Sequence, residues 1–284
     1  MSRSRNLDPP SNEELDALLR LLDDETPAVR ERVVERLTSC GGDLSEWLAG
    51  RAVPLSPHER SLLAEILRPA RREALAAEWS APTGGATALG DDWDACEALL
   101  RMISDFLHDG ITIRQPLSDA LDLLAEEAAE NGVTDALRLR SFLFSDGRLR
   151  GNRDAPEAPG NSDLAWSIAE GLSNPLGLCT IYILVAARLD LEVEAVNFPG
   201  HFLCRVHEDG YPVIVDCFDS GRLHLQASLL EDPDLGTAER KILRQSVGPG
   251  VVLLRLLNNL VAALVKDGRG ADARLIRKLR ASLR

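Results

Sequence analysis

The stretch from Asn174 to Phe218 constrains the fold of this chain more than any other part of the sequence. It opens with Asn174-Pro175, an N-cap residue followed by proline in the first turn, which predicts the start of a helix. The residues up to about Leu189 are apolar on nearly every side of that helix. Such a helix is typical of the buried centre of a domain.

From Glu192 the hydrophobic period changes to two, which is the pattern of strands. Three segments follow, EVEAV, HFLCRV and VIVDCF, and the polar HEDGYP turn separates the last two. We therefore predict an antiparallel sheet that contains a hairpin. A buried helix beside a small antiparallel sheet indicates an α+β fold class.

Helical patterns fill most of the remaining chain. Ser11 with Glu14 forms a capping-box pair, and Thr26-Pro27 opens a second helix that ends at Gly41-Gly42. Further helices are predicted over 57–79, 91–108, 117–131 and 134–144, with a helical hairpin around 267–270 near the end of the chain. A stretch rich in Gly and Pro, 145–161, is predicted to be a long loop.

These patterns divide the sequence into three regions. We predict a helical region over 1–80, then helices that lead into the α+β core over 91–226, and a helical tail over 227–284. The core itself covers about 137–226, and the Gly/Pro/Thr-rich segment 81–90 is the best linker.

Charge and cysteine usage exclude several classes of protein. The formal net charge of −13 disfavours binding to nucleic acid and to anionic membranes. The longest apolar stretch, 176–187, is too short to span a bilayer, and the N-terminal residues turn acidic before a signal peptide could form. The five cysteines include no CxxC pair. We expect a cytoplasmic protein with reduced thiols, no membrane or nucleic-acid partner, and no cofactor.

His201 and Asp216 are the residues most suggestive of chemistry. If the hairpin loop has two or four residues, His201 faces Phe218 and Leu203 faces Asp216, which makes His201 and Asp216 diagonal neighbours on one face. A histidine oriented by a carboxylate is half of a nucleophilic triad. The alternative is a structural His-Asp pair at a hairpin end, and a three-residue loop would break the register.

A cysteine near a helix N-terminus would complete a triad, because the helix dipole lowers the pKa of a thiol. Cys179 lies on the same helix face as Pro175 but one turn deeper, so a structural role in the core is favoured over catalysis. Cys204 alternates to the face opposite His201 and is too poorly placed to form a metal site with His201 and His207. We therefore predict no metal site.

Other residues near this cluster are weaker candidates for a binding groove. Asn197 and Arg205 lie close to His201 in the sequence, and Trp166 precedes the central helix. Two of them have a structural alternative, which is a strand-end turn for Asn197 and a core position for Trp166. Asn258 and Asn259 are interpreted as residues that satisfy backbone groups between helices.

The segments SNPLGLCTIYILVAARLDLEVEAVNFPGHFLCRV, VIVDCFDSGRLH and LLRLLNNLVAAL together resemble the SirB-type transglutaminase-like family of bacteria. The PGHF and RLLNN elements carry the resemblance, which covers about 137–284. It implies a papain-like transglutaminase core with TPR-like helices after it. The segment LLRLLDDETPAVRERVVERL resembles a HEAT repeat, with Asp24, Pro27, Val29 and Arg30 at the usual positions.

The resemblance also assigns roles to individual positions. His201 and Asp216 match the family's acid-base pair, whereas the position of the nucleophilic cysteine is occupied by Pro175. Three hypotheses follow. The first is a non-catalytic interaction or regulatory module with a protein or peptide partner. The second is a transamidase or hydrolase that uses Cys179 with His201 and Asp216, and the third is a small-molecule or peptide site built around the His-Asp pair.

Overall fold

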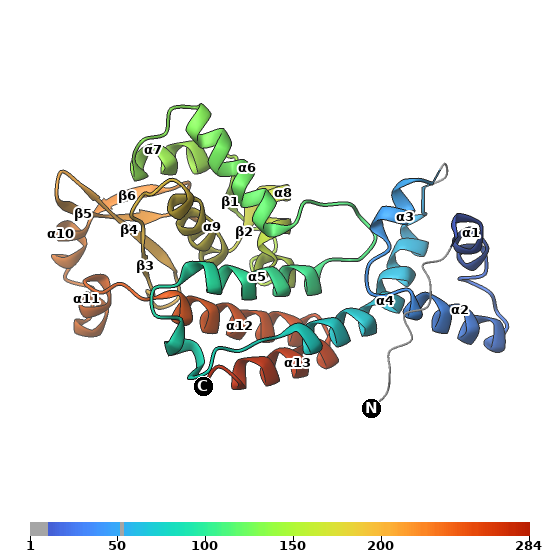
Figure 1. Cartoon of the computed structure of the whole chain (residues 1–284). Helices are drawn as coiled ribbons and strands as arrows, with labels where there is room; N and C mark the ends of the chain where they lie inside the picture. Colours follow the sequence, from blue (N-terminus) through green and yellow to red (C-terminus); the bar gives the residue numbers. More distant parts are fainter. Residues whose placement is uncertain (1–10, 52–53) are drawn as a thin grey trace. The chain divides into compact units, whose positions relative to one another are not determined.

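A computed structural model of the chain describes residues 11–51 and 54–284 (Figure 1). The fold divides into two compact units. Unit 1 contains Met1–Glu78 together with His108–Arg114, and unit 2 contains Trp79–Leu107 together with Gln115–Arg284.

Unit 1 is helical. Its helices are α1 (Asn12–Arg20), α2 (Pro27–Ser39), α3 (Ser45–Ala49) and α4 (Pro57–Glu78). Leucines at helical spacing from α1, α2 and α4, among them Leu15, Leu37 and Leu67, form one buried core. The predicted N-cap is confirmed, because the Ser11 hydroxyl accepts a hydrogen bond from the Glu14 backbone N–H at 3.2 Å.

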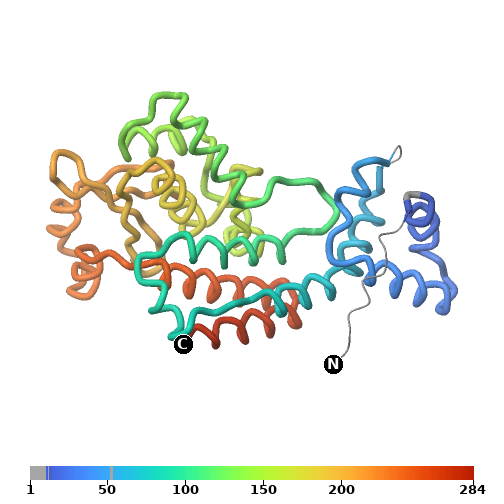
Figure 2. The backbone as a smooth tube through the Cα atoms, in the orientation of Figure 1, coloured from blue at the N-terminus to red at the C-terminus, as the bar shows by residue number. Residues whose placement is uncertain are grey.

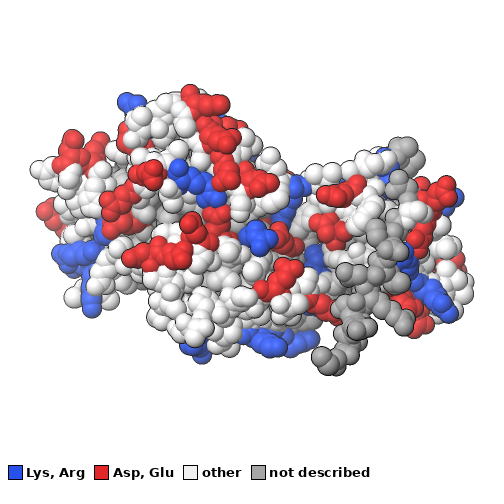
Figure 3. All heavy atoms as spheres, in the orientation of Figure 1, with Lys and Arg blue, Asp and Glu red and all other residues white. Residues whose placement is uncertain are grey.

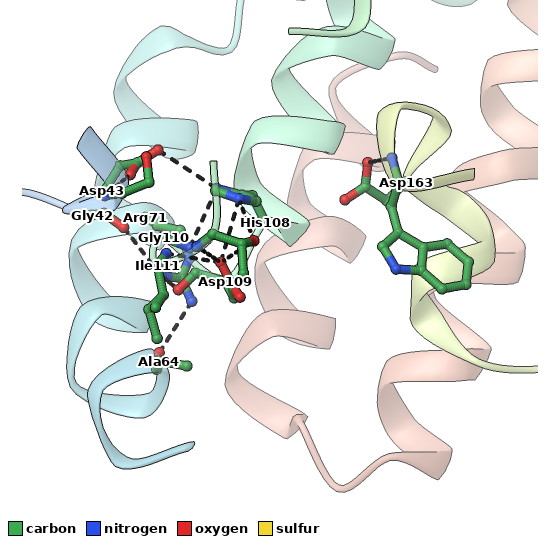
Figure 4. A network of polar contacts seen from close by, with 12 residues as sticks. Gly42, Asp43, Ala64, Arg71, His108, Asp109, Gly110, Ile111 and Asp163 are labelled. Carbon is green, nitrogen blue, oxygen red and sulfur yellow. Dashed lines mark hydrogen bonds and ion pairs between the residues drawn. The ribbon is translucent and has the colours of Figure 1, made fainter. Parts of the chain in front are cut away.

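The buried side chain of Arg71 on α4 forms hydrogen bonds with three separate segments of unit 1 (Figure 4). Nη1 of Arg71 donates to the carbonyl oxygens of Gly42 at 3.1 Å and Asp109 at 2.8 Å, and Nη2 donates to the carbonyl of Ala64 at 3.1 Å. Nearby, a hydrogen bond from His108 holds the pKa of Asp43 well below its usual value, against the opposing effect of burial. Residues 108–114 are thereby attached to α4.

Unit 2 surrounds the predicted central helix, α9 (Pro175–Arg188), whose residues from Leu176 to Ala186 are all buried. The prediction of a buried helix is confirmed. It packs against the helices that begin at Leu117, Ala136, Leu164 and Pro249 and against the strands Glu194–Val196 and Leu203–Glu208. The other helical elements are η1 (Gly85–Leu89), α5 (Trp93–Leu107), α6 (Leu117–Glu130), α7 (Ala136–Arg140), η2 (Ser141–Ser145), η3 (Pro159–Ser162), α8 (Leu164–Glu170), α10 (Gln226–Leu230), α11 (Thr237–Leu243), α12 (Pro249–Lys266) and α13 (Gly270–Ala281).

The sheet has four antiparallel strands in sequential order, β3 (Glu194–Val196), β4 (Leu203–Glu208), β5 (Tyr211–Asp216) and β6 (Arg222–Leu225). Cys204 lies opposite Val215 and Glu208 opposite Tyr211. The hairpin loop is therefore the two-residue Asp209-Gly210, one of the lengths that preserve the predicted register. Both loop residues have positive φ, 47° and 82°, as a tight hairpin turn requires.

Several elements differ from the sequence-based expectation. Strand β6 was not predicted, and the segment 145–161 is not all loop. Within it, β1 (Arg150–Gly151) pairs in parallel with β2 (Leu172–Ser173), and η3 begins at Pro159. A two-residue strand leaves no periodic signal in a sequence, because its pairing is decided by tertiary contacts.

Helix α12 corrects the expectation drawn from the longest apolar stretch. Its 18 residues have a mean hydropathy of 1.4, so their length and composition are those of a membrane-crossing helix. However, 56% of this window is buried inside the protein, against neighbours that include α5, α9 and α13. Figures 1 and 2 show α5, α12 and α13 side by side in unit 2. The helix is therefore explained as a core element of the folded unit.

Candidate functional site

A cavity of about 620 Å³ opens in unit 2 at the start of α9. Its wall is formed by the first turn of α9, the turn before β4, the residue Phe218 after β5, the loop 156–158 and one face of α12. His201, Pro175 and Arg255 all line it. Two positions that the sequence analysis singled out, Pro175 and His201, therefore meet Arg255, which it did not single out, at one place.

His201 and Asp216 are hydrogen-bonded, with 2.8 Å between Nε2 and Oδ1. The same Asp216 oxygen accepts the backbone N–H groups of Phe218 at 3.1 Å and Asp219 at 3.0 Å. A carboxylate can only accept here, so Nε2 carries the hydrogen and Nδ1 is left as the acceptor of the neutral ring. The Phe218 ring packs edge-on against the imidazole with centroids 5.9 Å apart.

The electrostatics of this pair favour a charged histidine. The hydrogen bond that His201 donates to Asp216 raises the pKa of His201 above 6.5, more than burial lowers it. Burial raises the pKa of Asp216, but the hydrogen bond to His201 and the two backbone N–H groups outweigh it and lower that pKa below 3.8. The geometry can orient an imidazole and hold a proton on it. Whether the pair is catalytic stays a prediction.

Pro175 occupies the first turn of α9, where the side chain of Asn174 caps the helix by accepting the Gly177 N–H at 2.8 Å. Both Asn174 and Pro175 line the cavity beside His201. Proline suits the first turn because its missing N–H has no intrahelical partner to lose. Its ring carries no nucleophilic atom.

Cys179 lies one turn deeper, has no exposed surface, and is not among the residues that line the cavity. Its thiol contacts the Phe202 carbonyl at 3.5 Å and lies in a cluster with Cys204 and Cys217. Burial raises the pKa of Cys179, but hydrogen bonds from the other two thiols lower it to about 6. A thiolate formed there is inaccessible, and a reactive cysteine needs access as well as a low pKa.

The three thiols form a cluster that the sequence analysis did not find. Their sulfur atoms all lie within 4.8 Å of one another and all three residues are buried. Sulfur ligands suit soft metals, but a structural zinc site needs a fourth ligand. Within the described part of the chain, no fourth His, Cys, Asp or Glu joins the three cysteines at that spacing. Burial raises the pKa of Cys204 and of Cys217 far above 9.0, which favours neutral thiols.

Arg255 is the site residue that the sequence analysis missed. With Asn259, Ala262 and Lys266 it forms a stripe along α12 that lines the cavity. These residues recur at helical spacing, and a polar stripe on an otherwise apolar helix was the signal available in the sequence. Asn259 therefore lines the cavity, which corrects its expected role between helices, while Asn258 is exposed and accepts a hydrogen bond from Arg280.

Comparison with known proteins agrees with this architecture. A family model described as the transglutaminase-like superfamily matches residues 112–258, more than half of the chain. The chain belongs to the transglutaminase-like superfamily. The match contains α9, the whole four-stranded sheet and Arg255.

Two curated proteins from Xylella fastidiosa are similar to this transglutaminase-like chain. The proteins from strains 9a5c and Temecula1, both named "UPF0162 protein", are 35% and 36% identical to it over 136 residues. The alignments cover 45% of this chain and 48% of each relative, so the chain spans about half the length of the curated relatives it matches. No solved structure matches significantly.

Within this transglutaminase-like unit, the three weaker candidates lie outside the cavity lining. Arg205 is buried on β4 and pairs with Glu194, which corrects its expected place in a groove. Trp166 lies in the first turn of α8, where its backbone N–H donates to the side-chain oxygen of the N-cap residue Asp163 at 3.0 Å, and Figure 4 labels Asp163. Asn197 does not line the cavity itself, but its side-chain oxygen accepts a hydrogen bond from Arg255, which does.

Proposed function

We propose that this chain is a non-catalytic transglutaminase-like module that binds a protein or peptide partner in the cavity beside His201 and Asp216. The observation that carries the proposal is the place of Pro175. It lines the cavity together with His201 at the start of α9, where the family resemblance requires the nucleophilic thiol. The His-Asp pair is retained, but its nucleophile is replaced.

The cavity has the character of a binding site. Its volume of about 620 Å³ falls within the usual range of ligand pockets, about 300 to 1,000 Å³. Apolar residues such as Phe202 and Phe218 form much of the wall, and a few polar groups converge on it. This combination favours recognition of a side chain or a chain end from a partner.

The alternative is a cysteine-dependent transamidase or hydrolase that uses Cys179 with His201 and Asp216. The pKa of about 6 at Cys179, to which nearby His201 contributes by lowering it, favours this alternative. Its burial opposes the idea, because a substrate carbonyl would have to reach a sulfur atom with no exposed surface. Movement of the first turn of α9 would be required.

Turnover assays separate the two functions. The full chain is incubated with peptide amides and activated esters, alongside the His201→Ala and Cys179→Ala variants. The binding proposal predicts no turnover above that of the variants. Turnover that disappears in both variants would refute the proposal and establish the enzyme.

We extend the proposal to the finer relationships of the chain. The PGHF and RLLNN elements support a place in the SirB-type branch of the superfamily, and the bacterial source of the similar proteins supports a bacterial origin. We propose that helices α1 and α2 act as a HEAT-like pair and α12 and α13 as a TPR-like hairpin, both of which are interaction elements. A cytoplasmic protein partner, rather than nucleic acid or a membrane, fits the net charge of −13.

A further inference from the structure

Arg255 places a positive charge in the wall of the cavity without a carboxylate to neutralise it. Its Nη1 donates to the side-chain oxygen of Asn197 and, at 2.9 Å, to the carbonyl of Phe198. The guanidinium also lies over the Phe202 ring, 5.2 Å from the centroid. Among the residues the structure describes, no Asp or Glu forms an ion pair with it.

The other charged groups of the cavity wall are already paired. Lys266 pairs with Glu157, and His201 pairs with Asp216 just behind the wall. Arg255 is therefore the one charge of the described lining that is left uncompensated. Its half-buried position is costly, since burial lowers the pKa of Arg255 more than its interaction with Cys179 raises it.

We propose that the cavity binds a carboxylate carried beside an apolar group, with Arg255 as its main contact. A guanidinium is planar and pairs with a carboxylate through two parallel hydrogen bonds, and within the described part of the chain only Nη1 of Arg255 makes hydrogen bonds. Asn259 lies one turn along the same face of α12 and can donate through its amide. This inference rests on the proposed function and names the ligand chemistry for the same cavity.

Two further features fit such a ligand. The N-terminus of α9 opens at the same cavity, and its dipole favours a negative charge. Apolar side chains lie beside the arginine, including Phe202, Phe218 and Ala262. In a peptide partner the carboxylate could belong to the C-terminus or to an Asp or Glu side chain, with a neighbouring apolar residue packed on these rings.

The test compares a matched pair of small probes, 3-phenylpropanoate and its neutral amide, by NMR titration of the isotopically labelled full chain. We expect the acid to bind at least tenfold more tightly than the amide. Arg255→Gln should weaken acid binding at least tenfold and leave amide binding unchanged. Arg244→Gln is the matched control, because Arg244 is exposed and outside the cavity, and it should bind both probes as the wild type does.

Arg255→Lys separates loss of the charge from a local folding defect in Arg255→Gln. Lysine retains the positive charge but cannot form two parallel hydrogen bonds with a carboxylate. It should keep part of the preference for the acid. Equal affinity for acid and amide, failure of both to bind, or unchanged acid binding in Arg255→Gln would overturn the inference. Tighter binding of inorganic phosphate at the same resonances would also overturn it.

Peptides then identify the source of the carboxylate. N-acetyl-Ala-Ala-Phe is compared as free acid and as C-terminal amide, together with an amidated peptide that contains Glu before Phe. Binding by the free acid alone assigns a C-terminus, and binding by the Glu peptide assigns a side chain. Equal binding of all three peptides would refute the carboxylate inference but not the proposed binding function. Turnover of an ester would refute the non-catalytic function, and the ratio of acid to amide binding would still test the carboxylate inference separately.

Discussion

At the scale of single residues, Asp216 determines how His201 is presented. One carboxylate oxygen accepts hydrogen bonds from the His201 imidazole and from two backbone N–H groups. The turn after β5 therefore holds the Asp216 carboxylate in position against the imidazole. The hairpin register could be derived from the sequence, because Asp209-Gly210 is a strong two-residue turn. Arg255 could not be derived in this way, since its contacts to Asn197 and Phe198 join residues more than fifty positions apart.

The hydrogen bond from His201 to Asp216 should be visible in the titration of His201. Because it raises the pKa of His201 above 6.5, the protonated ring stabilises the fold. That contribution is fully present below the unfolded-state pKa and is lost as the pH rises through the folded-state pKa. We expect an NMR midpoint above 6.5 in the wild type.

Asp216→Asn provides the comparison for that titration. An amide oxygen can still accept the N–H groups of Phe218 and Asp219, but the negative charge is lost. The midpoint of His201 should move downward in the variant, and the stability advantage of the wild type should shrink as the pH rises from below 6.5 through the raised folded-state pKa of His201. Identical midpoints in the two proteins would mean that the pair is not formed in solution.

At the scale of elements, helix α9 could be predicted well because its signals are local: the Asn-Pro start and the apolar run that follows it. The predicted strands were also found, whereas β6 was missed. That strand, Arg222–Leu225, has only four residues, and although its sequence RLHL alternates, its leucines are exposed at the edge of the sheet, so the alternation is too short to stand out. The thiol cluster was missed because α9, β4 and the end of β5 bring the three cysteines together only when the helix packs on the sheet.

Close packing beneath the first turn of α9 gives a test of that element. A Cβ atom on Gly177 would lie 2.2 Å from the Ser173 hydroxyl and 3.0 Å from the Asn161 carbonyl. Alanine has the higher helix propensity, but here we expect Gly177→Ala to destabilise the protein by about 1 to 3 kcal/mol through overpacking. Urea unfolding measures the change.

Gly270→Ala is the control, because its Cβ would meet nothing closer than Arg274 at 3.6 Å and the position is also helical. It should be neutral or slightly stabilising. If Gly177→Ala were as stable as this control, the packing of α9 against 161–173 would be looser than described.

At the scale of the whole molecule, the distribution of charged side chains determines which partners the surface attracts, and the burial of the cysteines determines which thiols a reagent can reach. Acidic and basic side chains are both scattered over the face shown in Figure 3, without a continuous basic strip on that face. Of the five cysteines, Cys40 in unit 1 is partly exposed, whereas the four in unit 2 are buried. Burial also raises the pKa of Cys96 to about 12.

This division predicts the order of thiol labelling during unfolding. In brief pulses of a maleimide along a urea gradient, Cys40 should react first. The four thiols of unit 2 should then become reactive in a single transition, because they share one cooperative core. Mass spectrometry of peptides identifies each site, and early reaction of Cys204 or Cys217 in native protein would contradict the described burial.

In the proposed function, Pro175 stands at an empty nucleophile position. Intact-mass labelling of folded protein with iodoacetamide at pH 6 tests it, using the wild type, Cys179→Ala, Pro175→Cys and Pro175→Cys with His201→Ala. We predict slow labelling of the first two proteins, a new rapidly labelled site in Pro175→Cys, and its slowing when His201 is removed, because the helix N-terminus and the imidazolium stabilise a thiolate there. Rapid labelling of wild-type Cys179 that requires His201 would contradict the account and identify a working thiol.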